Sequence, residues 1–209
     1  MTTNGLGLDT ANKTHGFDVV PAGTLVELVM KINPGNVGLE SLLKRSSKGD
    51  SEGLDCEFTI RGGEYSGRKL FDWMTLEGTL TGHAKAGEIS RAKLRAIFEA
   101  ANGVDPNDNS PATVARRASA ALASFHGATF LATLEIERGG KRPDGTGNFR
   151  DKNVIGKILR VGDQGYRRLE QPAPQPIERS ALPQPQTSAA PGGTPAMAAP
   201  AIARPTWAE

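Results

Sequence analysis

The sequence predicts a mainly β domain with a helical insertion, followed by a disordered tail. Several segments alternate apolar and polar residues with the period of two that is typical of half-exposed strands. Residues 90–125 instead show helical spacing, and from Gln171 onward the chain consists largely of Pro, Ala, Gln, Ser and Gly. Hydrophobic residues make up 37% of the 209 residues. This fraction is low for a compact protein of this length, so we expect part of the chain to remain unfolded.

Three strands are expected before the helices, at residues 24–32, 53–61 and 68–76. The second strand alternates most clearly, because Leu54 and Cys56 face one way while Asp55 and Glu57 face the other. A glycine-rich turn at residues 62–67 joins the second strand to the third. The simplest connection between them is a hairpin.

Two helices are expected after the third strand. At residues 90–102 apolar side chains such as Leu94 and Ile97 recur at helical spacing and form one stripe. Ser110 is a natural N-cap with a proline directly after it, so it predicts the start of a second helix that runs to about Phe125.

Two further strands are expected, at residues 128–138 and within residues 148–161, joined by a basic, Gly-rich connector. The order of three strands, a helical insertion and two strands is that of the OB-fold, a five-stranded Greek-key barrel. We therefore predict an OB-like barrel with two helices between its third and fourth strands. Other small β barrels and an α+β sandwich fit the same element order and stay open as alternatives.

Four stretches of the chain resemble an uncharacterised phage and prophage family. They are DVVPAGTLVELVMKI (residues 18–32), GEYSGRKLFDWMTLEG (63–78), ISRAKLRAIFEAANGV (89–104) and FHGATFLATLEIERGG with NVIGKIL (within 125–159). Members of this family are thought to be OB-fold single-stranded-DNA-binding proteins encoded among phage replication and recombination functions. The resemblance implies a sequence-non-specific protein of phage or prophage origin that assists recombination or replication in the cytoplasm of a bacterial host cell.

Single-strand binding needs cations that follow phosphates and exposed rings on which bases stack. In an OB-fold these groups lie on the second and third strands and on the two flanking loops. The mildly basic composition, with a formal net charge of +2, is compatible with this role. The candidate nucleic-acid-binding residues are Lys44, Arg45, Lys48, Tyr65, Arg68, Lys69, Phe71, Trp73, Lys141, Arg142, Phe149 and Arg150.

The third strand carries the most informative pattern. Lys69, Phe71 and Trp73 share one face, which is the pattern of a stacking platform, while Tyr65 in the preceding turn is expected to be exposed. Phe71 could instead belong to the core. Asp55 and Glu57 would repel phosphate if they shared this face, unless they pair with Lys69 or Arg61 across the hairpin.

The chain divides into a flexible N-terminus (1–16), an OB-like nucleic-acid-binding domain (17–168) and a disordered Pro/Ala-rich tail (169–209). Trp207 and Glu209 at the end of the tail are candidates for binding a recombinase or helicase. The alternative function is a protein-interaction adaptor that recruits such a partner without direct DNA contact. RNA as the ligand and homo-oligomerisation also stay open.

No enzymatic activity, cofactor or metal is expected. His15, His83 and His126 lie far apart in the sequence, and Cys56 falls on the apolar face of a strand, where a buried thiol is the default. A minor alternative is a metal-dependent nuclease built on strand carboxylates, which are Asp55, Glu57, Asp72, Glu135 and Glu137. The sequence has no signal peptide or long apolar run, which predicts a soluble intracellular protein with no membrane contact.

Overall fold

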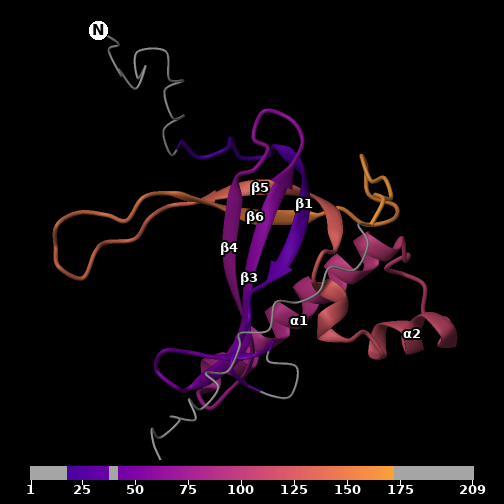
Figure 1. Ribbon diagram of the computed structural model, residues 1–209, viewed down its shortest axis with the longest axis horizontal. Coiled ribbons are helices and arrows are strands. Elements are labelled where there is room, and N and C mark those ends of the chain that lie inside the picture. The colour runs from indigo at the N-terminus through magenta and orange to yellow at the C-terminus, as the bar shows by residue number, and fades with distance from the viewer. Residues whose placement is uncertain (1–17, 38–41, 172–209) are drawn as a thin grey trace, which may run out of the picture. The chain divides into compact units, whose positions relative to one another are not determined.

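The computed structural model describes residues 18–37 and 42–171. Within these ranges the chain forms an open antiparallel sheet of six strands and two α-helices (Figure 1). The N-terminus predicted to be flexible (1–16) and the tail residues Trp207 and Glu209 lie outside the described residues. None of the helices in these ranges is long and apolar enough to cross a membrane.

Four strands precede the helices and two follow them. They are β1 (Leu25–Ile32), β2 (Lys44–Arg45), β3 (Ser51–Arg61), β4 (Lys69–Gly78), β5 (Thr129–Glu137) and β6 (Lys152–Ile158). The five long strands are those that the sequence predicts. The short strand β2 is not apparent in the sequence, because two residues are too few to show alternation.

The long strands follow the path β4-β3-β1-β5-β6, and β2 pairs with the beginning of β3. All of these pairings are antiparallel. The mainly β architecture with a helical insertion between β4 and β5 is therefore confirmed. Among the described residues no hydrogen-bonded ladder joins β4 to β6, so the sheet stays open along one seam.

The core lies between the inward faces of the long strands. Leu28, Met30 and Ile32 of β1 are fully buried, as the period-two pattern predicts. Phe58 of β3 meets Phe130 of β5 edge to face, with ring centroids 6.0 Å apart. Such a pair stabilises the fold by more than the burial of its apolar area alone. Here it connects β3 with β5, which are not neighbours in the sheet.

The helices differ in length from the prediction. Helix α1 (Thr81–Asn102) starts well before residue 90, in a stretch without an apolar stripe. Within this stretch Gly87 packs closely against the Leu76 carbonyl of β4. Helix α2 (Pro111–Ala118) ends before Phe125, and a separate 3-10 turn, η2 (Leu122–Phe125), completes the insertion.

The buried carboxylate of Glu99 joins three parts of the chain. Arg95 of α1 donates to it at 2.8 Å, and Arg160, after β6, donates to its other oxygen at 3.2 Å. Arg117 of α2 lies 2.8 Å from the first oxygen without the angle of a hydrogen bond, and its guanidinium donates instead to the Asp108 carbonyl. One carboxylate therefore holds both helices and the segment after β6.

The segment after β6 also returns to the core through side chains. The Tyr166 hydroxyl donates to the Ala100 carbonyl of α1 at 3.1 Å. The Gln171 amide pairs with both the N–H and the C=O of Thr129 in β5, at 2.8 and 2.9 Å. A side-chain amide carries the same donor and acceptor as a peptide group, so it can continue a sheet where no strand follows.

We expect Glu99→Gln to lower the free energy of unfolding by about 3 kcal/mol, because it leaves the largely buried Arg117 guanidinium, and the more exposed ones of Arg95 and Arg160, without their counter-charge. Urea denaturation followed by circular dichroism measures the change. The matched control is Glu88→Gln, an exposed carboxylate on the same helix, which should change stability by less than about 0.5 kcal/mol. Equal stability of the two variants would show that the cluster does not hold the fold.

Candidate nucleic-acid interface

Two aromatic side chains stand on the outer face of β4. Phe71 is 63% exposed and Trp73 is 37% exposed, while Leu70 before them and Met74 after them are buried. The Trp73 indole N–H donates to the Thr75 hydroxyl at 3.1 Å, which fixes the orientation of the ring. Phe71 therefore belongs to the surface, and the alternative in which it joins the core is wrong.

The register of β3 and β4 places a carboxylate opposite each ring. Phe71 faces Glu57 and Trp73 faces Asp55 as direct cross-strand partners. Directly opposite residues in an antiparallel pair lie close enough to interact. The two acidic residues therefore share the aromatic face, which is the arrangement that weakens phosphate binding unless their charges are compensated.

Both charges are compensated by lysines. Lys69 approaches Glu57 at 2.8 Å, which is the cross-hairpin pair that the sequence suggests. Lys44 of β2 approaches Asp55 at 2.7 Å, and the Asn33 amide adds a hydrogen bond to the same carboxylate. The hydrogen bond from Lys44 is the main cause that lowers the pKa of Asp55 below its ordinary value, and the Asn33 bond acts in the same direction.

The first of the two flanking loops brings fewer free cations than expected. Lys44 is ion-paired with Asp55, and Arg45 is ion-paired as well, because its guanidinium lies 2.7 Å from the carboxylate of Glu52. Lys48 is exposed in the turn that follows β2 and is the loop cation that has no ion pair among the described residues. The residues fall where the sequence places them, but ion pairing reduces their net charge.

Lys31 of β1 is a surface cation that is not among the predicted site residues. It is exposed, lies directly opposite Glu57 in the β1–β3 register, and has no ion-pair partner in the described part of the chain. The signal for it is present in the sequence, because the alternation that buries Met30 and Ile32 must point Lys31 outward. The row Phe71, Glu57, Lys31 crosses three strands.

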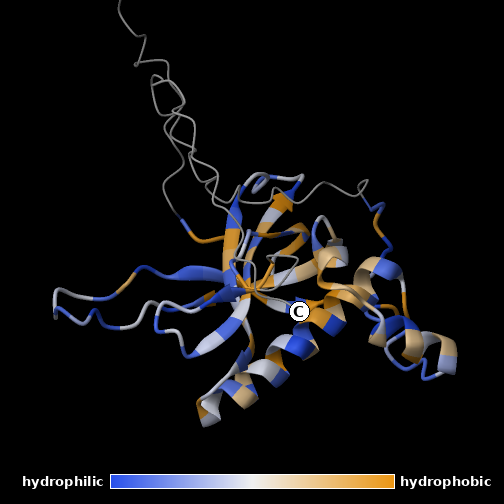
Figure 2. Ribbon diagram, turned by 60° about the horizontal axis from the view of Figure 1, so that its bottom comes forward, coloured by the Kyte–Doolittle hydropathy of each residue, from blue (hydrophilic) through white to orange (hydrophobic). Residues whose placement is uncertain are grey.

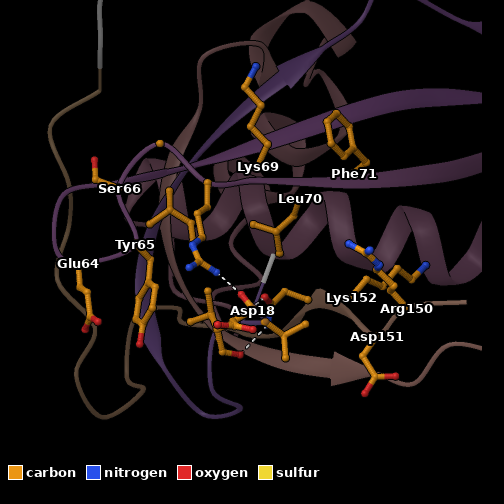
Figure 3. A pocket seen from close by; sticks show the side chains of 16 residues that line it. Asp18, Glu64, Tyr65, Ser66, Lys69, Leu70, Phe71, Arg150, Asp151 and Lys152 are labelled. Carbon is orange, nitrogen blue, oxygen red and sulfur yellow. Dashed lines mark hydrogen bonds between the residues drawn. The ribbon is translucent and has the colours of Figure 1, made fainter. Parts of the chain in front are cut away.

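A hollow of about 910 Å³ opens beside this face, at the seam between β4 and β6 (Figure 3). Its lining includes five of the predicted residues, which are Tyr65, Arg68, Lys69, Phe71 and Arg150. Figure 3 shows Lys69 and Phe71 pointing to the opposite side of the strand from Leu70. The hollow therefore connects the aromatic face of β4 with the start of β6.

Two predicted residues in the turn before β4 have a structural role. Tyr65 is half-buried and packs against the core, so the expectation that it is exposed is wrong. The Arg68 guanidinium lies 5.2 Å above the Tyr65 ring and donates to the backbone carbonyl of Asp18. The turn folds back onto the sheet because the Tyr65 ring finds apolar neighbours and a cation to cover it.

The chain from Asp18 to Val20 bridges the seam. The Asn153 side chain accepts a hydrogen bond from the Val20 N–H and donates to the Val20 carbonyl, both at 2.7 Å. Arg68 holds Asp18 from the β4 side. Side chains thus connect the two strands that no backbone ladder joins.

The β5–β6 connector, residues 138–151, forms an antiparallel ribbon that we call the basic arm. The Phe149 N–H donates to the Gly140 carbonyl and the Arg142 N–H to the Gly147 carbonyl, both at 2.8 Å. At its base Gly139 is required, because a Cβ there would lie 1.8 Å from the Phe149 carbonyl oxygen. Figures 1 and 2 show the arm projecting away from the sheet, and Figure 2 shows it as mostly hydrophilic.

The arm presents the remaining predicted residues. Lys141, Arg142 and Phe149 are all exposed, and the Arg142 guanidinium lies 5.5 Å above the Phe149 ring. Neither Lys141 nor Arg142 has a carboxylate partner within residues 18–37 and 42–171. The structure thus separates the predicted residues into a group on the sheet and a group on the arm.

Four of the five strand carboxylates of the nuclease alternative are engaged in ion pairs. Besides Asp55 and Glu57, Asp72 lies 2.6 Å from Lys93 of α1 and Glu137 lies 3.3 Å from Lys152. No group of three or more His, Cys, Asp or Glu side chains in the described ranges is placed to hold a metal ion. Burial raises the pKa of the Cys56 thiol to about 12, so it remains protonated at neutral pH.

Comparisons with protein-family models, with curated proteins and with solved structures find no match to this chain. The geometry of the aromatic face and of the arm is therefore the basis on which a function is inferred.

We expect the pKa of Asp55, measured by NMR titration, to lie below 3.8, its ordinary value. Because the folded-state pKa is the lower one, the ion pair stabilises the fold above that ordinary value and loses its effect as pH falls. Replacing Lys44 by methionine should raise the pKa of Asp55 toward 3.8. The matched control Arg45→Met, which removes a neighbouring cation paired with a different carboxylate, should leave it unchanged.

Proposed function

We propose that this protein binds single-stranded DNA on the outer face of β3 and β4, without requiring a defined sequence. The observation that carries the proposal is the pair of exposed rings, Phe71 and Trp73, side by side on one face of β4. Every base has a π-face, so bases of any kind can stack on such rings. A large exposed aromatic pair otherwise costs solubility, which favours a ligand that covers it.

The strand path supports an OB-like barrel that is open at the seam between β4 and β6. In an OB-fold the first strand pairs with the second and fourth, the third with the second, and the fifth with the fourth, which matches the path β4-β3-β1-β5-β6. Oligonucleotides bind to OB-folds across the second and third strands, between two flanking loops. Those strands are β3 and β4 here, and the basic arm is the second flanking loop.

The charge distribution favours a binding mode in which base stacking contributes more to affinity than phosphate contacts do. The carboxylates beside the rings are neutralised by Lys44 and Lys69, so these lysines add little net charge. Lys31 is a cation on this face without a carboxylate partner among the described residues. Single strands lie with their bases on the rings and their phosphates toward Lys31. The resemblance to phage proteins favours a role in recombination or replication in a bacterial host.

A second candidate is a protein-interaction adaptor. The two exposed rings, beside carboxylates whose charges lysines compensate, would also suit an apolar segment of a partner protein such as a recombinase or helicase. An adaptor of this kind would bind its partner and no DNA. Measurement of DNA affinity by fluorescence anisotropy therefore distinguishes the two candidates, because the adaptor predicts no salt-dependent binding of an oligonucleotide.

We expect Phe71→Ala and Trp73→Ala each to weaken binding of a labelled single-stranded oligonucleotide by roughly 5- to 150-fold. A stacked base contributes about 1–3 kcal/mol, and 1.4 kcal/mol corresponds to about tenfold in affinity. In a Trp207→Phe background Trp73 is the remaining tryptophan, so DNA binding should quench the fluorescence of the protein.

The control variant is Ile89→Ala, which removes another exposed apolar side chain, on helix α1. It should bind DNA like the unchanged protein. If all three variants bind alike, the aromatic face is not the binding site. If the unchanged protein binds no oligonucleotide even at low salt, the adaptor is the better candidate.

A further inference from the structure

The basic arm is an ordered element with its own chemistry. Its two halves are joined by backbone hydrogen bonds and by a bridge between Lys141 and Asn148. The tip is held by Asp144, whose carboxylate accepts from both the N–H and the hydroxyl of Thr146 at 3.0 and 2.7 Å. These hydrogen bonds lower the pKa of Asp144, so its carboxylate stays charged at neutral pH and keeps its hydrogen bonds to Thr146.

The arm adds two cations, Lys141 and Arg142, to the one that the sheet offers in Lys31. The lysines beside Phe71 and Trp73 are ion-paired, whereas Lys141 and Arg142 have no carboxylate partner in the described part of the chain. The Arg142 guanidinium stacks over the Phe149 ring, which fixes both groups and leaves the edge of the guanidinium free to donate. The strongest site for phosphate is therefore on the arm.

The arm reaches a different part of the ligand from the one that the sheet binds. At about 3.3 Å per residue the ribbon extends roughly 15–20 Å from the ends of β5 and β6. Its base lies at the hollow, which Phe71 and Arg150 both line, and its tip projects away from the sheet (Figure 1). A phosphate bound by Lys141 on the arm therefore lies outside the surface on which a nucleotide stacks against Trp73.

We propose that the arm binds duplex DNA next to the single strand on the sheet, so that the protein recognises a junction between single-stranded and double-stranded DNA. This inference rests on the proposed function. The major groove of DNA admits a two-stranded β-ribbon. In that position Lys141 and Arg142 contact phosphates of the duplex, and the exposed Phe149 packs against its last base pair.

The test compares three fluorescein-labelled DNAs by anisotropy. They are a single strand of about 12 nucleotides, a blunt duplex of about 15 base pairs, and that duplex carrying the single strand as a tail. We expect the tailed duplex to bind about tenfold tighter than either of the others, since it alone occupies both groups of residues.

The double variant Lys141→Ala with Arg142→Ala should lose this preference and keep its affinity for the single strand within about twofold. Its salt slope on the tailed duplex should fall by about 1.8, which is 0.9 for each lost phosphate contact. The matched control is Lys85→Ala with Arg116→Ala, which removes the same charge from exposed positions on α1 and α2. The control should behave like the unchanged protein.

The outcomes separate this inference from the proposed function. If the unchanged protein binds none of the three DNAs, both fail. If it binds the single strand but binds the tailed duplex no tighter, the junction inference alone is overturned. The junction inference alone is also overturned if the arm variant weakens binding to the single strand and to the tailed duplex equally, because the arm would then contact the strand that lies on the sheet.

Discussion

The pairing register of β3 and β4 is the constraint on which the proposed interface depends. A slip by one residue would turn Phe71 and Trp73 into the core and expose Leu70 and Met74. A β-bulge after Glu52 adjusts the pairing, and Gly53 is needed there because a Cβ would lie 2.4 Å from the Met74 carbonyl oxygen. The same register sets each carboxylate opposite a ring, so the stacking surface and its charge compensation are specified together.

Much of the fold could be predicted from the sequence, because alternation and helical spacing are local signals. The same alternation also gave the outward face of β4, although whether Phe71 was covered by another element is a tertiary question. The missed features depend on contacts between distant residues. The first turns of helix α1 carry no apolar stripe and lie against β4 at Gly87, and Tyr65 is half-buried because the turn folds back onto the core. The pairing of Lys44 with Asp55 required the unpredicted strand β2.

Under the proposed function, the molecule separates two kinds of attraction that single-strand binders usually combine in one groove. The sheet offers aromatic surface beside which Lys31 is a cation without an ion-pair partner among the described residues, so its attraction for a ligand should depend weakly on salt. The arm offers Lys141, Arg142 and one ring covered by a guanidinium, on a ribbon that projects from the sheet. Long-range attraction and orientation would then come from the arm, and close contact from the sheet. The hollow at the seam lies between these two groups.

The seam itself is held by a side-chain amide in place of a backbone ladder. Asn153 can bridge to Val20 only because an amide offers a donor and an acceptor at once. Deamidation would turn this group into a carboxylate, which keeps the bond to the Val20 N–H but repels the Val20 carbonyl. Deamidation of this one residue would thus weaken the attachment of residues 18–20 to β6 while every strand pairing stays intact.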